Sequence, residues 1–319
     1  MAIAAGAAVW PWTARAQLAD RVAQIGMLYP GFSAVTVTRI AALRDGLRAV
    51  GYLDAERAEI LVRASEGDPN KLADLAADLV ARKVNAIVAI SPSALRSAKS
   101  ATTTIPIVAN DLESDPVASG FVSSLSHPGG NITGVFSDFP DFGTKWLELL
   151  KETIPTLSSV TALWDPATGP TQLEAVKNAG RLLNVKLDVV EIRAIAELQL
   201  AFQKAGEHRP DAVIILSSPI FGTNPKLIAD LTIEHHIPTA TLFSEIARAG
   251  SLMSYGPNLL DTFRQTGTML GKMLQGVLPA DLPVERPTKF EMVINLKTAR
   301  ALGLSVPTSI LLRADEVVE

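Results

Sequence analysis

Short apolar runs alternate along this chain with longer segments in which apolar residues recur every three or four positions. The short runs predict strands, and the longer segments predict helices with one buried face. The strand runs are continuously apolar, so both faces of each sheet should be covered, as in parallel sheets. In the first half, the expected strands lie at residues 22–28, 59–63, 85–90 and 105–109.

The same order of elements occurs again in the second half. Asn-Ala-Ile-Val at residues 85–88 corresponds to Asp-Ala-Val-Ile at residues 211–214. The duplication predicts an α/β fold of two doubly wound parallel-sheet lobes, with a small-molecule site in the cleft between them. The expected strands of the second lobe are residues 160–164, 186–190, 211–216 and 237–241.

Further segments predict that the chain passes between the lobes more than once, which would make a hinge. They are two strands at residues 131–136 and 252–257, a helix at 261–274 and a late strand at 288–295. The expected N-terminal lobe is 21–134 plus about 258–283, and the expected C-terminal lobe is 135–257 plus about 284–319.

Composition narrows the function classes. The chain has 319 residues, of which 48% are hydrophobic and 19% charged, which is typical of a globular protein. Its net charge of −4 makes nucleic acid a poor partner. With no cysteine, it can form no disulfide, thiolate metal site or cysteine-linked lipid anchor. The histidines show no metal-ligand spacing, and the His235-His236 pair favours a solvated helix end over a metal site. We expect no metal or cofactor.

Residues 1–16 are predicted to be an export signal. Residues 2–12 are small or apolar, and Ala14-Arg15-Ala16 offers an Ala-x-Ala cleavage site. The mature protein would then begin near Gln17 and lie free in the periplasm. No Lys or Arg precedes the apolar run, which leaves open an internal start at Met1. A disordered Ala-rich tail is the alternative interpretation.

Candidate ligand contacts follow the strands, because ligands of parallel sheets bind beyond the carboxyl ends of the strands. Ser91-Pro92-Ser93 and Ser217-Ser218 place hydroxyls at expected helix starts, where free N–H groups attract a carboxylate. These serines could equally be plain N-caps. The candidate contacts are Tyr29, Gly31, Phe32, Ser91, Pro92, Ser93, Asn110, Asp111, Asp138, Phe139, Asp165, Ser217, Ser218, Phe243, Ser244 and Tyr255.

Aromatic residues are scarce, at 5% of the chain, yet more than half of them lie at or just beyond expected strand ends. As a group they favour a ligand with an apolar or planar body, although any single ring could instead pack the sheet rim. Asp111, Asp138 and Glu245 could meet a cationic amine.

The sequence does not support catalysis. Gly-x-Ser-x-Gly, Gly-x-Gly-x-x-Gly, a P-loop and His-Glu-x-x-His are all absent, and no Ser, His and acid come together by spacing. We therefore expect a binding protein and no enzyme.

Five distinctive segments lie at residues 127–134, 252–257, 278–284, 287–299 and 301–307. Together they resemble the tryptophan/tyrosine-type family of ABC-transporter substrate-binding proteins. The resemblance runs from about Arg21 to the C-terminus. It implies the type I periplasmic-binding-protein fold, with three crossovers, a ligand in the cleft and a membrane permease as partner.

The resemblance also implies site residues. Ser91 to Ser93 match the loop that would receive a carboxylate, and Ser217 to Phe221 match its counterpart in the second lobe. Asp138 and Phe139 match the first crossover, and Tyr255 a Ser-Tyr-Gly segment. Relatives often carry Gly-Asp-Pro-Val after the fourth strand, where this chain has Leu112-Glu-Ser-Asp-Pro-Val117, so the amine-binding residue stays open.

Together these features predict a monomeric periplasmic receptor that closes around one small molecule and hands it to a permease. The ligand would carry a carboxylate and an aromatic or apolar body, as an amino acid or aromatic acid does. The same fold could instead bind a sugar or an amide. It could also serve as the effector domain of a transcription regulator, which would need a basic DNA-binding module, or as the scaffold of an enzyme.

Overall fold

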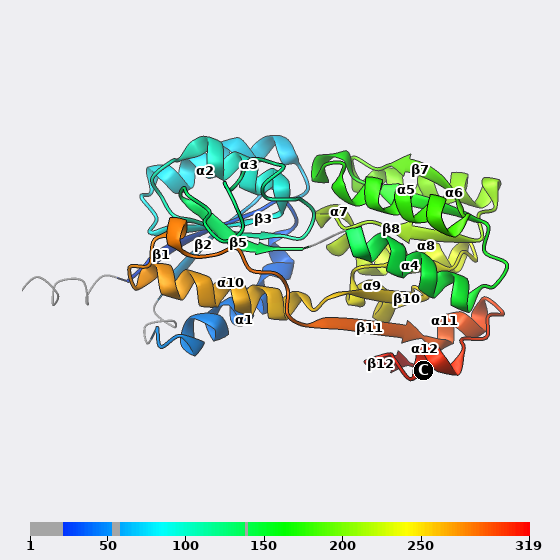
Figure 1. The fold of residues 1–319 in the computed structure, drawn as a ribbon. Coiled ribbons are helices and arrows are strands. Elements are labelled where there is room, and N and C mark those ends of the chain that lie inside the picture. The colour runs from blue at the N-terminus through cyan, green and yellow to red at the C-terminus, as the bar shows by residue number, and fades with distance from the viewer. Residues whose placement is uncertain (1–21, 53–57, 138–139) are drawn as a thin grey trace, which may run out of the picture.

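The computed structural model describes residues 22–52, 58–137 and 140–319. In this part of the chain, two α/β lobes stand side by side and are joined by several segments (Figure 1). The predicted signal segment and the candidate contacts Asp138 and Phe139 lie outside the described residues.

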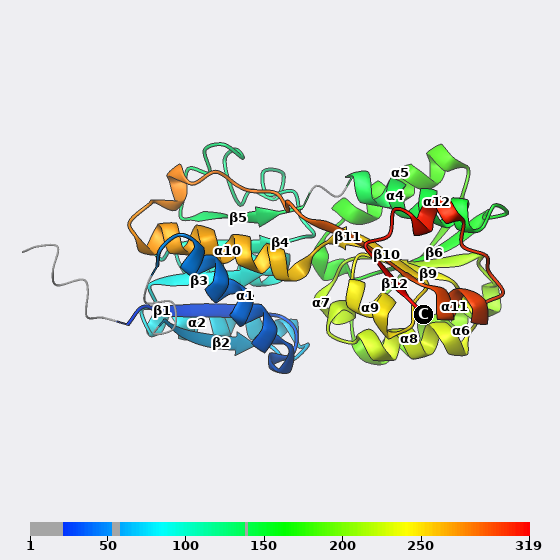
Figure 2. The same ribbon diagram turned by 90° about the horizontal axis from the view of Figure 1, so that it is seen from below.

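The N-terminal lobe contains a five-stranded parallel sheet in the order β2-β1-β3-β4-β5. Helices α1 (Thr36–Ala49) and α10 (Leu259–Leu274) cover one face, and α2 (Leu72–Ala81) and α3 (Ser91–Ala101) cover the other (Figures 1 and 2). The strands are β1 (Gln24–Tyr29), β2 (Glu59–Ala64), β3 (Ala86–Ile90), β4 (Ile107–Asp111) and β5 (Ile132–Phe136).

The C-terminal lobe contains a seven-stranded sheet in the order β12-β11-β10-β9-β8-β6-β7. All neighbouring strands are parallel except β10 and β11. The strands are β6 (Ser159–Trp164), β7 (Lys186–Glu191), β8 (Ala212–Ile215), β9 (Thr239–Thr241), β10 (Met253–Pro257), β11 (Phe290–Asn295) and β12 (Glu316–Val318). The helices are α4 (Pro140–Thr153), α5 (Thr171–Leu183), α6 (Leu198–His208), α7 (Pro219–Gly222), α8 (Pro225–Glu234), α9 (Ser244–Ala249), α11 (Leu296–Ala301) and α12 (Thr308–Leu311).

Three crossovers join the lobes. The chain passes from β5 to α4, from β10 to α10, and from α10 back to β11. Helix α10 therefore belongs to the N-terminal lobe although its neighbours along the chain belong to the other lobe (Figure 2). This confirms the predicted fold class of two parallel-sheet lobes with repeated crossings.

Local signals in the sequence explain several element ends. Asp68 accepts a hydrogen bond from the backbone N–H of Asn70 and begins the turn that leads into α2, with Pro69 at the first position. Asn184 adopts the left-handed conformation that ends α5, as expected for a short polar side chain. No helix among the described residues is long and apolar enough to span a membrane.

Helices α1 and α10 are packed at backbone distance. A Cβ atom on Gly46 would lie 1.9 Å from the carbonyl oxygen of Arg264, and one on Gly267 would lie 2.0 Å from that of Leu43. Only glycine permits such an approach at these positions. Because α10 lies between two crossovers, this contact anchors the hinge to the N-terminal lobe.

Candidate ligand-binding cleft

Two adjoining cavities lie between the lobes and share Ser91 and Pro219 in their walls. The first cavity has a volume of about 40 Å³ and the second about 30 Å³, so the lobes lie close together over the cleft. In both, one wall comes from the ends of N-terminal-lobe strands and the other from α7 and nearby loops of the C-terminal lobe. They form the cleft that the duplicated sequence predicts.

Apolar side chains dominate the first cavity. The sequence pattern predicts Tyr29 and Phe243 at strand ends, and both line this cavity from opposite lobes. Phe263 of α10 also lines it, although no strand-end rule could indicate a residue in the middle of a helix. The remaining apolar lining comes from Ile90, Leu112, Pro219 and Leu259.

Arg39 supplies a cation to the same cavity. Its guanidinium lies 5.1 Å from the centroid of the Tyr29 ring and 5.7 Å from that of Phe263, and it donates a hydrogen bond to the Tyr29 hydroxyl. Cation–π contacts hold the charged group against the aromatic wall. Sequence reasoning missed Arg39 because it lies in the first turns of α1.

The start of α3 lies where the two cavities meet. Ser91 is buried and has a φ of 75°, a left-handed conformation that is strained for a residue with a side chain. The N-cap residue Ile90 makes no side-chain hydrogen bond to this helix end, and the Ser91 and Ser93 hydroxyls are 3.1 Å apart. Pro92 is buried as well. The N–H groups of Ser91 and Ser93 lie at this helix start, which is a favourable place for an anion, whereas Pro92 has no N–H.

Glu113 joins the two lobes directly. Its carboxylate accepts a hydrogen bond of 2.6 Å from the Ser217 hydroxyl of the other lobe, in a buried position on the wall of the first cavity. Burial raises the pKa of Glu113 well above its usual value, and the nearby Asp111 and Asp165 carboxylates raise it further. Sequence reasoning singled out the segment that contains Glu113 but not this residue.

Asp111 and Asn110 have structural partners. Asp111 accepts hydrogen bonds from the backbone N–H groups of Glu113 and Ser114, at 2.9 and 3.0 Å, and from the Ser114 hydroxyl. Its carboxylate thus shapes the loop that presents Glu113, and burial raises its pKa. Asn110 lines the first cavity but donates to Thr262 and Thr266 of α10.

In the C-terminal lobe, Asp165 lines the second cavity and accepts a hydrogen bond of 2.6 Å from the Ser218 hydroxyl. Ser218 also accepts from the N–H of Ile220, so it is the N-cap of α7. Burial raises the pKa of Asp165. Ser217 is held by Gln172, which accepts from its N–H and donates to its carbonyl. The hydroxyls of this loop are therefore used within the protein.

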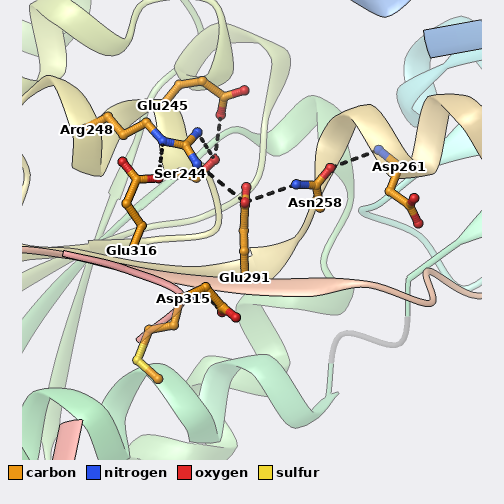
Figure 3. Close-up of polar contacts among 9 residues, drawn as sticks. Ser244, Glu245, Arg248, Asn258, Asp261, Glu291, Asp315 and Glu316 are labelled. Carbon is orange, nitrogen blue, oxygen red and sulfur yellow. Dashed lines mark hydrogen bonds and ion pairs between the residues drawn. The ribbon is translucent and has the colours of Figure 1, made fainter. Parts of the chain in front are cut away.

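The remaining candidates lie at the margins. A Cβ on Gly31 would be 2.7 Å from Thr223 of the other lobe, so this glycine permits close approach of the lobes. Phe32 is only half-buried and lines neither cavity. The Ser244 hydroxyl accepts a hydrogen bond from Arg248, within a network that extends to Glu291 and Asn258 (Figure 3).

Tyr255 does not line the two cleft cavities. Its ring lies in a separate cavity at the hinge, together with Phe142 and Phe290. The structure thus brings together Tyr29, Ser91, Asn110 and Phe243 around the first cavity, and Ser91, Ser93 and Asp165 around the second.

Comparison with known proteins identifies the family of this chain. Residues 35–318 match the family model described as "ABC transporter substrate binding protein". The chain belongs to this family. Its members bind substrates and are not enzymes, which confirms the prediction that this chain is no enzyme. Substrate-binding proteins of ABC transporters act outside the cytoplasm, and their ligands are passed to a membrane permease.

Individual relatives cover most of the chain. A tyrosine-binding protein from Clostridioides difficile is 25% identical over 83% of this chain and 75% of its own length. A Streptococcus pneumoniae structure in complex with L-Trp is 26% identical, covers 93% of this chain and 100% of its own, and has a TM-score of 0.85. A Vibrio cholerae conserved domain protein has 25% identity, the same coverage and the same TM-score. These similarities confirm the predicted resemblance.

Proposed function

We propose that the protein is the periplasmic receptor of an ABC importer for an amino acid with an aromatic or large apolar side chain. The observation that carries the proposal is one cavity between the lobes with an apolar wall, an uncapped helix start and a buried carboxylate. The ligands of two relatives, tyrosine and L-Trp, support the same class.

Each part of such a ligand has a complementary group. The carboxylate would accept hydrogen bonds from the start of α3 and from the Ser91 and Ser93 hydroxyls. The ammonium would lie near Glu113, whose burial without a cation is unfavourable. The side chain would contact the rings of Tyr29, Phe243 and Phe263. Arg39, held against two of these rings, would offer a donor at the far end.

Closure of the lobes follows from contacts that span the cleft. Glu113 meets Ser217, and Arg96 of α3 donates a hydrogen bond of 2.6 Å to the carbonyl of Ala167 in the other lobe. A ligand that touches both lobes adds to these contacts only in the closed form and therefore favours it. We propose that this closed form is the one the permease recognises.

A thermal-shift screen tests the ligand class. Binding to the folded state alone stabilises it by roughly 2.7 kcal/mol when free ligand is a hundredfold above Kd. We expect tryptophan, tyrosine or phenylalanine to raise Tm, and sugars, amides and small aliphatic amino acids to leave it unchanged. A rise in Tm with sugars alone would be consistent with a solute receptor but would contradict the proposed ligand class.

A further inference from the structure

A third cavity lies at the hinge, and among the residues that the structure describes it shares no wall residue with the two cleft cavities. It is partly open to solvent and has a volume of about 500 Å³. Its walls come from segments beside all three crossovers: Ser137 after β5, Phe142 and Lys145 of α4, Tyr255 of β10, and Arg286 and Phe290 before and in β11.

One wall of this cavity consists of aromatic rings. The centroid of the Phe142 ring lies 6.0 Å from that of Tyr255 and 5.8 Å from that of Phe290. The Tyr255 and Phe290 rings are stacked, with centroids 6.4 Å apart and an interplanar angle of 24°. Phe290 is nevertheless 44% exposed, so an aromatic face remains open for a planar molecule.

Polar groups border the rings. Lys145 and Arg286 line the cavity, and the ammonium of Lys145 is 3.8 Å from its ion-pair partner Glu148 at the surface. The Ser137 hydroxyl is buried, and it has no hydrogen-bond partner in the described part of the chain. A buried hydroxyl without a partner is uncommon in native proteins, and this one lies on the cavity wall. Two cations and a free hydroxyl complement a carboxylate.

We propose that the hinge cavity is a second binding site, for a small aromatic carboxylate. Its ring stacks on Tyr255 and Phe290, and its carboxylate binds Lys145 and Arg286. Because the walls adjoin all three crossovers, which change conformation when the lobes move, the occupant favours one lobe arrangement and alters affinity in the cleft. This coupling rests on the proposed function, whereas the site itself does not.

Two tryptophans distinguish the hinge from the cleft in NMR spectra. The Trp146 indole N–H donates to the Tyr255 carbonyl at 2.8 Å and packs on Phe142, so it reports on the hinge cavity. The Trp164 indole N–H donates to the Gly169 carbonyl, across the loop in which Asp165, Ala167 and Thr168 line the second cleft cavity, so we use it to report on the cleft. A triple variant, in which Trp10, Trp12 and Trp164 are replaced by Phe, retains Trp146. Its one remaining indole signal is therefore that of Trp146.

The probe is 2-naphthoate, titrated into the ¹⁵N-labelled protein. We expect the Trp146 signal to shift and saturate. Phe290→Ser and Lys145→Gln should each raise the apparent Kd for 2-naphthoate severalfold, because each removes one contact with the probe. The double variant should raise it roughly tenfold or more. Leu312→Ser, which changes a residue that is 82% exposed elsewhere in the C-terminal lobe, should leave Kd unchanged.

The proposal is overturned if only Trp164 shifts, if neither signal shifts, or if the Trp146 titration is unaltered in the double variant. A parallel titration with L-tryptophan separates this result from the proposed function. A Trp164 shift with L-tryptophan would support the cleft as an amino-acid site even if 2-naphthoate failed at the hinge. A saturating Trp146 shift with 2-naphthoate would support the hinge site even if L-tryptophan failed in the cleft.

Discussion

Glu113→Gln should make the free protein more stable at neutral pH and bind its ligand more weakly. Gln keeps an oxygen that can accept the Ser217 hydrogen bond but carries no charge to bury. The variant thus removes the cost of a buried carboxylate in the fold. If Glu113 meets the ligand's ammonium, its loss weakens binding by about 2 kcal/mol or more, roughly thirtyfold in Kd.

The pH dependence of the free energy of unfolding distinguishes two reasons for a more stable Glu113→Gln variant. One is the removal of a buried acid, and the other is a change in packing. The pKa of Glu113 is raised in the folded protein, so between the unfolded and folded pKa values the folded state binds more protons. The free energy of unfolding should therefore fall as pH rises from the unfolded pKa through the folded one. Asp111 and Asp165, whose pKa values are also raised, contribute in the same direction.

Chemical denaturation at a series of pH values measures this effect. The wild type should lose stability across that range, and Glu113→Gln should lose less. Glu174→Gln is the control, because Glu174 is an exposed carboxylate on α5 that pairs with Lys177. A variant that is less stable than the wild type at neutral pH, or that follows the same pH curve, would show that Glu113 is not a costly buried acid.

Gly46→Ala and Gly267→Ala should each destabilise the protein strongly. The added methyl would meet backbone carbonyl oxygens at 1.9 and 2.0 Å, and no rotation of a side chain can relieve that contact. Helices α1 and α10 would have to separate, with a loss of about 3 kcal/mol or more. At a helix position with free space around it, Gly→Ala would instead raise the free energy of unfolding by up to about 1 kcal/mol. A loss of stability therefore indicates backbone-distance packing.

Urea unfolding followed by circular dichroism checks the two glycines. Gly130→Ala is a suitable control, because nothing lies within 4 Å of the added methyl and its φ is not positive. The double variant should cost clearly less than the sum of the single variants, since the first methyl already separates the helices. Additive losses, or losses no larger than the control's, would contradict backbone-distance packing.

The fold followed from patterns that are local in the sequence. Apolar runs identified the central parallel strands such as β3 and β8, because burial on both faces leaves little room for polar residues. The edge strands β2 and β7 carry charged residues and are only partly buried. The later crossovers were also indicated by local patterns, an apolar strand run at residues 252–257 and a helical run at residues 261–274. Such signals need no knowledge of which segments meet in space.

The site was only partly predictable because the strand-end rule has two limits. It identifies residues beyond a strand but not residues on helices, so Arg39 of α1 and Phe263 of α10 were missed. Phe263 reaches the cleft only because α10 returns to the N-terminal lobe. The rule also does not say which side a residue faces, and successive strand residues face opposite sides. Tyr255 accordingly lies in the hinge cavity.

Titration calorimetry with three related compounds tests the central claim most directly. L-tryptophan carries an ammonium, a carboxylate and an indole, whereas tryptamine lacks the carboxylate and indole-3-propionate lacks the ammonium. We expect one L-tryptophan per chain and at least roughly tenfold weaker binding of both analogues. Tryptamine leaves the start of α3 without an anion, and indole-3-propionate leaves Glu113 without a cation. Equal binding of all three, or no binding of L-tryptophan, tyrosine or phenylalanine, would contradict a cleft built for an aromatic amino acid.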